Sequence, residues 1–193
     1  MAVKLEINDL SAFRNTHLNK QIGVTFSCWD LLHAGHHLFL ADSRNNCDIL
    51  CVGLQTDPTI DRPEKNKPIQ TLEEREIQLK NCRAVDYYFV YDTEQSLFNT
   101  LLALDPNIRF LGDDYVGKKF TGNELPIDIF YHPRSQHMFS STNLRKRIYK
   151  VELQNVELQN VELQNVELQN VELQNAELQN VELQNVELLN ISQ

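Results

Sequence analysis

Residues 26–39 read FSCWDLLHAGHHLF, and this stretch determines the fold that we predict for the chain. The residues from Gln21 to Trp29 are rich in Ile, Val, Thr and Phe, which predicts a buried strand. From Ala34 to Asn45, apolar residues recur with a helical period, which predicts a helix. The chain is therefore predicted to pass here from a strand into the N-terminus of a helix.

Two histidines, His33 and His36, lie at this predicted helix N-terminus, with Gly35 between them. Unpaired backbone N–H groups and the helix dipole favour an anion there, and a glycine lets a ligand approach the backbone closely. We expect both imidazoles to donate to one phosphate chain. The structural alternative is a surface histidine pair at a helix start, which an isolated pair would favour.

Strands and helices alternate along the chain as far as residue 131. Further strands are predicted at 47–56, 86–91, 108–112 and 127–131, and helices at 71–83 and 93–104. This alternation predicts an α/β fold, a Rossmann-like parallel sheet with helices on both faces. Ligands bind such sheets at the carboxyl ends of the strands, where we expect the histidines, the loop after residue 56 and Gly112 to meet.

The net charge of −9 lies almost entirely at the C-terminal end of the 193 residues. Residues 151–190 carry eight Glu and no Lys or Arg, whereas the remaining residues hold 19 acidic and 18 basic side chains. Because nucleic-acid binding needs a basic surface, the nearly neutral charge of the remaining residues argues against it. We find no signal peptide and no apolar run of membrane length, so we expect a cytoplasmic protein with no membrane partner. The four cysteines lack Cys-x-x-Cys spacing, which predicts reduced thiols and no metal site.

The string D-L-L-H-A-G-H at residues 30–36 resembles the signature of the cytidylyltransferase-like nucleotidyltransferases. It is most similar to the glycerol-3-phosphate cytidylyltransferase branch, whose members read G-T-F-D-L-L-H-x-G-H. Residues 27–29 depart from that pattern, because Ser-Cys-Trp stands where the family usually has Gly-Thr-Phe or Gly-Cys-Phe. The resemblance implies that the two histidines are catalytic and that the nucleotide is bound by this stretch: Cys28, Trp29, Asp30, His33 and His36.

Residues 111–115, Leu-Gly-Asp-Asp-Tyr, resemble the G-D-D-W stretch of the family, which lies beside the nucleotide and the acceptor. The resemblance implies that Gly112 and Asp113 contact the nucleotide and that Asp114 contacts the acceptor. The alternative is that both carboxylates only cap the following turn.

A basic loop follows the predicted strand at 47–56 and reads DPTIDRPEKNKPIQTLEER from residue 57. We predict that Lys65, Lys67 and Arg75 bind the acceptor, and the family places a catalytic lysine here that Lys67 matches best. The alternative for the lysines is solvated surface. For Arg75 it is a structural ion pair with Glu73 or Asp57.

Residues 132–148 read HPRSQHMFSSTNLRKRI and contain three hydroxyl side chains at a predicted helix start. Ser140, Ser141 and Thr142 would form a second phosphate cradle with the unpaired N–H groups of that helix, or only an ordinary N-cap. The string F-S-S-T-N-L-R resembles the family's I-S-[ST]-T-x-[IL]-[KR]. Arg134 matches the arginine that precedes it, which implies a catalytic, nucleotide-binding role.

The chain is divided into three parts by its sequence. Residues 1–20 are predicted to be an N-terminal extension that packs on a nucleotidyltransferase domain at 21–150. Residues 83–86, Arg-Ala-Val-Asp, resemble the family's R-Y-V-D segment, which lies at its dimer interface and implies a homodimer. The alternative is an ordinary connection between a helix and a strand.

Residues 151–193 form the repeat tail, which contains six copies of VELQN with one AELQN and one VELLN. Each unit advances by about 140° beyond a full helical turn, so Val and Leu do not share one helix face. The period resembles that of pentapeptide-repeat β-helices. Glu, Leu and Gln favour an α-helix, so we predict one long helix, with disorder as the alternative. The repeat has either an oligomerisation role or no selected function.

These features together predict a nucleotidyltransferase that transfers CMP from CTP to a phosphorylated small alcohol and releases pyrophosphate. By resemblance the best acceptor is glycerol 3-phosphate, giving CDP-glycerol, with Mg²⁺ carried on the nucleoside triphosphate. Adenylyl transfer to a heptose phosphate and cytidylyl transfer to ethanolamine or choline phosphate share the same motifs. A non-catalytic nucleotide-binding or scaffolding module is the alternative of a different class.

Overall fold

The structure is a computed structural model that describes residues 1–191, with side chains described for residues 1–175. It divides into two compact units, Met1–Asn143 and Leu144–Gln193. The sheet belongs to the first unit.

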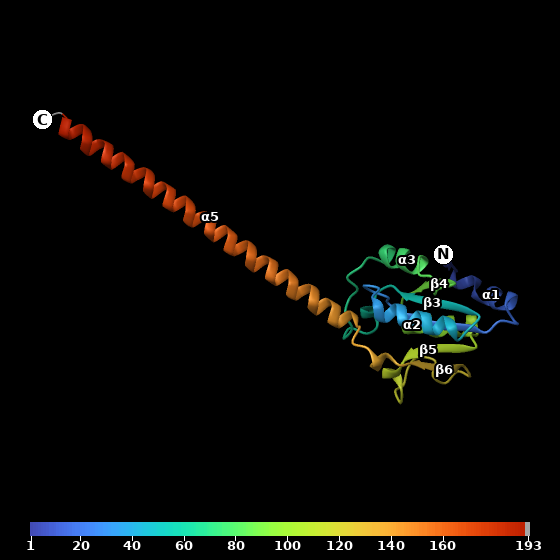
Figure 1. Ribbon diagram of the computed structural model, residues 1–193. Helices are drawn as coiled ribbons and strands as arrows, with labels where there is room; N and C mark the ends of the chain where they lie inside the picture. The colour runs from blue at the N-terminus through green and yellow to red at the C-terminus, as the bar shows by residue number, and fades with distance from the viewer. Residues whose placement is uncertain (192–193) are drawn as a thin grey trace. The chain divides into compact units, whose positions relative to one another are not determined.

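A parallel sheet of six strands forms the middle of the first unit, in the order β1-β4-β3-β2-β5-β6 (Figure 1). Five of its strands agree with the predicted ranges to within two residues. The strands are β1 (Val3–Lys4), β2 (Ile22–Ser27), β3 (Ile49–Gln55), β4 (Tyr87–Tyr91), β5 (Ile108–Gly112) and β6 (Asp128–His132). The predicted α/β, Rossmann-like fold is therefore confirmed.

The N-terminal extension packs on the sheet and also adds a strand that the sequence did not predict. β1 pairs in parallel with β4, with Val3 opposite Tyr87. Helix α1 (Leu10–Thr16) then buries Leu10 and Phe13 against the sheet. The first 20 residues are thus an integral part of the domain.

Helices cover both faces of the sheet. On one face, α2 (Ala34–Asn45) and α3 (Leu72–Lys80) contribute Leu40 and Leu79 to a core with β3 and β5. On the other face, α4 (Glu94–Leu104) packs with α1 and buries Leu97, Leu101 and Leu104. These three leucines recur at helical spacing, which is why this segment forms an amphipathic helix.

Polar caps fix the points at which α3 and α4 begin. Thr71 accepts a hydrogen bond from the backbone of Glu74, whose carboxylate returns one to the backbone of Thr71, as the sequence predicted. Thr93 and Ser96 form the same arrangement at α4. The loops before these helices, which leave the carboxyl ends of β3 and β4, therefore end at defined positions.

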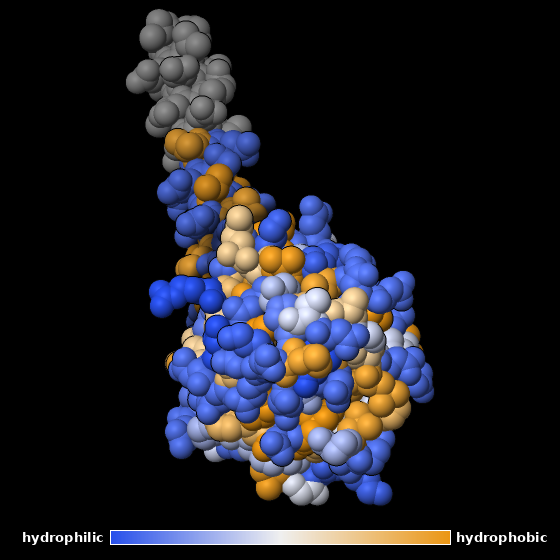
Figure 2. Space-filling view, turned by 90° about the vertical axis from the view of Figure 1, so that its right-hand side faces the viewer, coloured by the Kyte–Doolittle hydropathy of each residue, from blue (hydrophilic) through white to orange (hydrophobic). Residues whose placement is uncertain are grey.

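Helix α5 (Ser141–Ile191) contains the repeat tail. From residue 151 to 175 its Val and Leu side chains are about half exposed or more, and Figure 2 shows hydrophobic and hydrophilic residues interleaved along it. This matches the expectation that a five-residue period gives an α-helix no apolar face. No helix in the described part of the chain is both long and apolar enough to cross a membrane.

Candidate active site

His33 and His36 lie at the N-terminus of α2 with stacked rings, whose centroids are 3.9 Å apart. His33 is the N-cap residue, and its Nδ1 accepts a hydrogen bond from the backbone N–H of Gly35 at 3.1 Å. The backbone N–H of His33 donates in turn to Nδ1 of His36 at 3.4 Å. Because each Nδ1 is an acceptor, each neutral ring carries its proton on Nε2 and can donate from there.

Burial sets the charge of both rings. It lowers the pKa of His36 to about 3, with smaller contributions from His33 and Arg134. The pKa of His33 is also lowered, first by burial and then by the positive charge of Arg134. At neutral pH both imidazoles are therefore uncharged hydrogen-bond donors.

Position 35 requires a glycine because residues 137–139 pack directly against its Cα atom and leave no room for a side chain. A Cβ atom at this position would lie 2.9 Å from the carbonyl oxygen of Phe139 and 3.1 Å from Cε1 of His137. The sequence predicted close approach by a ligand, whereas here residues 137–139 make that approach. This packing brings the segment before α5 against the N-terminus of α2.

Trp29 and Asp30 are buried beside the predicted nucleotide site, where the Trp29 ring lies edge-on to the ring of His36, with centroids 5.3 Å apart. Trp29 is buried, and its Nε1–H donates to the carbonyl of Gly53 at 2.9 Å. Asp30 is only 2% exposed, and its carboxylate accepts from the backbone N–H groups of Ile69 and Gln70 at 3.0 and 2.9 Å. Because both side chains bond to protein groups, the backbone is the part of Trp29 and Asp30 that can contact phosphate. The Asp30 carboxylate holds the end of the basic loop at residues 69 and 70.

The backbone here is also unusual. Trp29 and Leu31 have φ of 50° and 51°, in the left-handed region that large side chains rarely adopt. Such conformations cost free energy and persist only where surrounding contacts hold them, often at functional sites. The buried Trp29 ring and the two bonds to Asp30 supply those contacts.

Arg75 has a different position from the acceptor contact that the sequence predicted. It is 3% exposed, and its Nη1 donates to the carbonyls of Cys28 and Gln55 at 2.9 and 2.6 Å. Its Nη2 donates to Thr56 at 2.7 Å, and its Nε to Thr71 at 3.3 Å. Because the guanidinium is occupied by carbonyls at the ends of β2 and β3, we assign it to the support of the site rather than to the acceptor.

The two lysines of the basic loop remain candidates for a phosphate contact. Lys65 and Lys67 are exposed, and Nζ of Lys67 lies 4.0 Å from Asp57 Oδ2. At this distance and exposure the ion pair is weak, so the side chain of Lys67 can turn toward an incoming anion.

Carboxylates at the end of β5 hold the segment that carries Arg134. Asp113 accepts hydrogen bonds from the backbone N–H of Ser135, at 3.1 Å, and from its hydroxyl, and these bonds lower the pKa of Asp113. Nη1 of Arg134 lies 3.6 Å from Asp114 Oδ2. A Cβ on Gly112 would lie against the carboxylate of Asp114, so the glycine leaves room for the present position of that side chain. Both aspartates therefore contact residues 134–135 rather than only capping the turn that follows β5.

The predicted hydroxyl cradle lies beside the histidines. Ser140 Oγ accepts from the backbone N–H of Asn143 at 3.1 Å, which is an ordinary N-cap bond. Ser141 Oγ lies 3.2 Å from Nε2 of His33 and donates to the carbonyl of Asp30. Thr142 is exposed on the first turn of α5. The two predicted phosphate-binding motifs, more than 100 residues apart, thus touch through His33 and Ser141.

An open pocket of about 530 Å³ lies between the end of β5 and the segment that leads into α5. Several of the residues that the sequence selected separately line it together. The lining residues are Asp113, Asp114, Arg134, Ser135, His137, Met138, Phe139, Ser140 and Asn143.

Two histidines near the pocket were given no role by the sequence. His132 at the end of β6 is buried, and its Nδ1 lies 2.6 Å from Asp42 Oδ2 of α2. The ring of His137 lies between His132 and Phe139. Their positions depend on the fold of β6 against α2, so no local motif identifies them.

Residues 83–86, which resemble the family's dimer-interface segment, begin with an exposed residue and end with one that is bonded within the chain. Arg83 is exposed, whereas Asp86 Oδ2 accepts from Nε of Arg44 and from the backbone N–H of Leu50, both at 2.8 Å. Asp86 thus has a structural role within one chain.

Comparison with known proteins gives two family matches. The model of the cytidylyltransferase-like family matches residues 24–147, which include all the site residues described above. The model of pentapeptide repeats matches eight copies in residues 152–188. The second match recognises the five-residue period, which in this structure lies in an α-helix.

Curated relatives include bifunctional HldE proteins. That of Wolinella succinogenes is 36% identical over 111 residues, which are 57% of this chain and 23% of the relative. That of Nitrobacter hamburgensis is 36% identical over 148 residues, which are 72% of this chain and 28% of the relative. The chain thus spans about a quarter of the length of these relatives. The crystal structure of pantoate-beta-alanine ligase from Francisella tularensis shares the fold, with a TM-score of 0.52 and 15% identity over 75% of this chain and 76% of the ligase.

Proposed function

Since this chain is a nucleotidyltransferase of the cytidylyltransferase-like family, we propose that it transfers an adenylyl group from ATP to a sugar phosphate of the heptose type. The sequence motifs favoured CTP as the donor and glycerol 3-phosphate as the acceptor. The similarity to HldE proteins supports adenylyl transfer to a sugar phosphate better than that assignment. This proposal is supported above all by the contact between His33 and Ser141, which brings together the two helix N-termini predicted to bind phosphate.

In the proposed reaction, a phosphate oxygen of the acceptor forms a bond to the α-phosphorus of the nucleotide. The bond from this phosphorus to the bridging oxygen breaks, and pyrophosphate leaves with that oxygen. Nε2–H groups of His33 and His36 donate to the phosphoryl oxygens, where negative charge accumulates in the transition state. Arg134 leaves its weak pair with Asp114 and neutralises the triphosphate, whose end is held by Ser140, Ser141 and Thr142.

Mg²⁺ fits this site only as an ion that arrives with the nucleotide. The described residues hold no group of three His, Cys, Asp or Glu that could bind a metal, and both carboxylates in the pocket contact protein groups. Phosphate oxygens and water are ordinary ligands of Mg²⁺, which would neutralise part of the triphosphate charge. The protein would therefore act on the ion only through the phosphates.

The acceptor is proposed to bind between the basic loop and the end of β5. Lys67, with Lys65 as the second candidate, would approach the acceptor phosphate, and Asp114 would accept from acceptor hydroxyls once Arg134 has turned to the nucleotide. Cytoplasmic location and a homodimer remain parts of the proposal.

Pyrophosphate release tests the function directly. The full chain is mixed with ATP or CTP and, in turn, heptose 1-phosphate, glycerol 3-phosphate or choline phosphate. We expect turnover with ATP and the heptose phosphate, and at least tenfold lower kcat/KM for every other pair. A preference for CTP with glycerol 3-phosphate would contradict this proposal and support the CDP-glycerol synthesis that the sequence motifs predicted. No release with any pair, despite nucleotide binding in calorimetry, would leave a non-catalytic binding module.

A further inference from the structure

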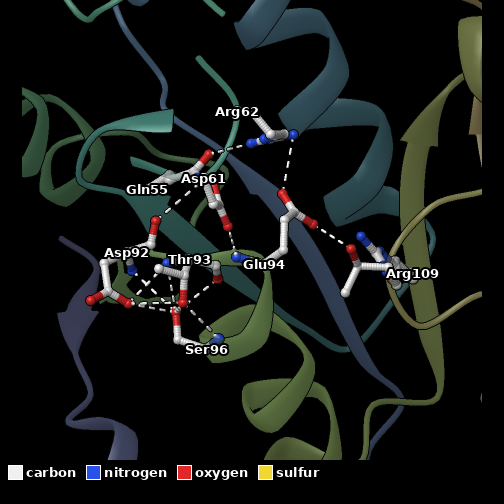
Figure 3. Close-up of polar contacts among 9 residues, drawn as sticks. Gln55, Asp61, Arg62, Asp92, Thr93, Glu94, Ser96 and Arg109 are labelled. Carbon is white, nitrogen blue, oxygen red and sulfur yellow. Dashed lines mark hydrogen bonds and ion pairs between the residues drawn. The ribbon is translucent and has the colours of Figure 1, made fainter. Parts of the chain in front are cut away.

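Glu94, the first residue of α4, reaches two loops that leave different strands (Figure 3). Its Oε1 lies 3.1 Å from Nη1 of Arg62, in the loop after β3. Its other carboxylate oxygen accepts a hydrogen bond from the hydroxyl of Thr121, in the loop after β5. Its backbone N–H donates to Asp61 at 2.5 Å. One residue therefore joins the basic loop to the loop that begins with the two aspartates.

Buried groups anchor both ends of this bridge. Arg62 Nη2 donates at 2.7 Å to the side chain of Gln55, which is fully buried at the end of β3. At the other end, Arg109 of β5 donates to the carbonyl of Thr121. The Arg109 guanidinium lies over the rings of Phe26 and Phe120, at 5.2 and 5.1 Å from their centroids. The bridge thus connects two strand ends and is not confined to flexible loop atoms.

The side chain of Glu94 is not needed to start its own helix. Thr93 and Ser96 already form the cap of α4, and the acidic side chain there gains a favourable but small interaction with the helix dipole. The carboxylate is about 30% exposed and so is Arg62, which makes their pair less screened than a surface ion pair. We therefore attribute the position of the Glu94 carboxylate to its contacts with Arg62 and Thr121 in the two loops.

We propose that Glu94 is a positioning residue that sets the distance between the basic loop, with Lys65 and Lys67, and the loop that begins at Asp113. This inference rests on the proposed function, which assigns both loops to the acceptor. Losing the carboxylate removes the link between the two loops, while each loop keeps its own anchor at Gln55 or Arg109. We therefore expect the spacing of the acceptor site to loosen while the histidines and Ser141 keep their geometry.

Glu94→Ala and Glu94→Gln test the proposal, with Glu76→Ala as the matched control. Glu76 is also partly buried and paired, but with Lys4 at 2.6 Å rather than with either loop. For Glu94→Ala we expect the KM of the acceptor to rise about tenfold, as for a lost charge-assisted hydrogen bond, with kcat and the KM of the nucleotide within about threefold of wild type. Glu94→Gln retains an acceptor oxygen and should recover part of the loss, and Glu76→Ala should leave both KM values unchanged.

Hydrogen exchange followed by mass spectrometry gives the second readout. Backbone amides of residues 58–67 and 115–125 should exchange faster in Glu94→Ala than in the wild type, and those of α2 should not. Faster exchange with an unchanged acceptor KM would overturn the assignment of these loops to the acceptor. Unchanged exchange would overturn the bridge itself. A wild-type chain without turnover would refute the proposed function, while the exchange data would still decide whether Glu94 holds the loops.

Discussion

His36 is a neutral donor in a partly buried position, and its role depends on that state. Its pKa of about 3 means that phosphate meets an N–H dipole at neutral pH and that the ring gains no proton before binding. Donors of this kind accelerate a reaction when they are already oriented toward the charge that develops in the transition state. The bond from the backbone of His33 to Nδ1 of His36 provides that orientation.

We therefore expect His36→Ala to lower kcat by about a hundredfold or more, while the chain remains folded. The measurement is steady-state pyrophosphate release, with far-UV circular dichroism to check the fold. His17→Ala is the matched control, because His17 is a half-buried histidine whose Nδ1 contacts the carbonyl of Phe13 near α1. A change in KM with unchanged kcat would mean that the histidines bind phosphate only in the ground state.

At the residue scale, the sequence predicted that the histidine motif and the hydroxyl motif meet, but not how Asp30 and Arg75 are used. His33 and Ser141 are in contact because strand ends of a parallel sheet meet at one edge, which the alternation of elements already implied. The use of Arg75 could not be predicted, because the carbonyls of Cys28 and Gln55 that it bonds are brought together only in the folded sheet. The same is true of Asp30, whose carboxylate is bonded to residues 39 and 40 positions away.

At the scale of elements, Arg75 of α3 joins two strand ends to the start of its own helix. Replacing it by Met would remove the hydrogen bonds that Nη1 donates to the carbonyls of Cys28 and Gln55, at a cost of about 1–3 kcal/mol for each. We expect Arg75→Met to lower the free energy of unfolding by about 3–5 kcal/mol, as measured by urea denaturation at pH 7.

The exposed Arg83 provides the control, and Arg83→Met should change the unfolding free energy by less than about 0.5 kcal/mol. The sequence had suggested instead that Arg75 contacts the acceptor. An Arg75→Met variant with wild-type stability and a change only in the KM of the acceptor would support the acceptor contact and contradict the structural role.

The elements themselves were largely predictable, and the exceptions have a physical reason. β3 is buried along its whole length, and α4 repeats leucine at helical spacing, so both patterns are strong in the sequence. β1 is two residues long with both side chains exposed, so its sequence carries no periodic pattern. It is a strand only because the edge of β4 is available to pair with it.

At the scale of the whole molecule, charge and apolar surface are divided unevenly along the chain. The repeat tail carries eight of the acidic residues and no basic ones, whereas the rest of the chain is almost neutral. Within residues 151–175, Val and Leu side chains are exposed on all sides of the helix. Since apolar residues that rotate around a helix cannot share one partner surface, the repeat has no continuous seam for a coiled coil.

A chain that ends after Lys150 should therefore fold and retain its turnover, because every residue assigned to the site lies before that point. We also expect the truncated chain to be a dimer if the segment at 83–86 forms the interface, as the family resemblance implies. Light scattering gives the oligomeric state, and the circular dichroism difference between full and truncated chains should show minima at about 208 and 222 nm for a helical tail. A monomer, or turnover reduced more than about threefold, would mean that the repeat builds the oligomer or supports the domain, and a difference spectrum of the β type would contradict the helix.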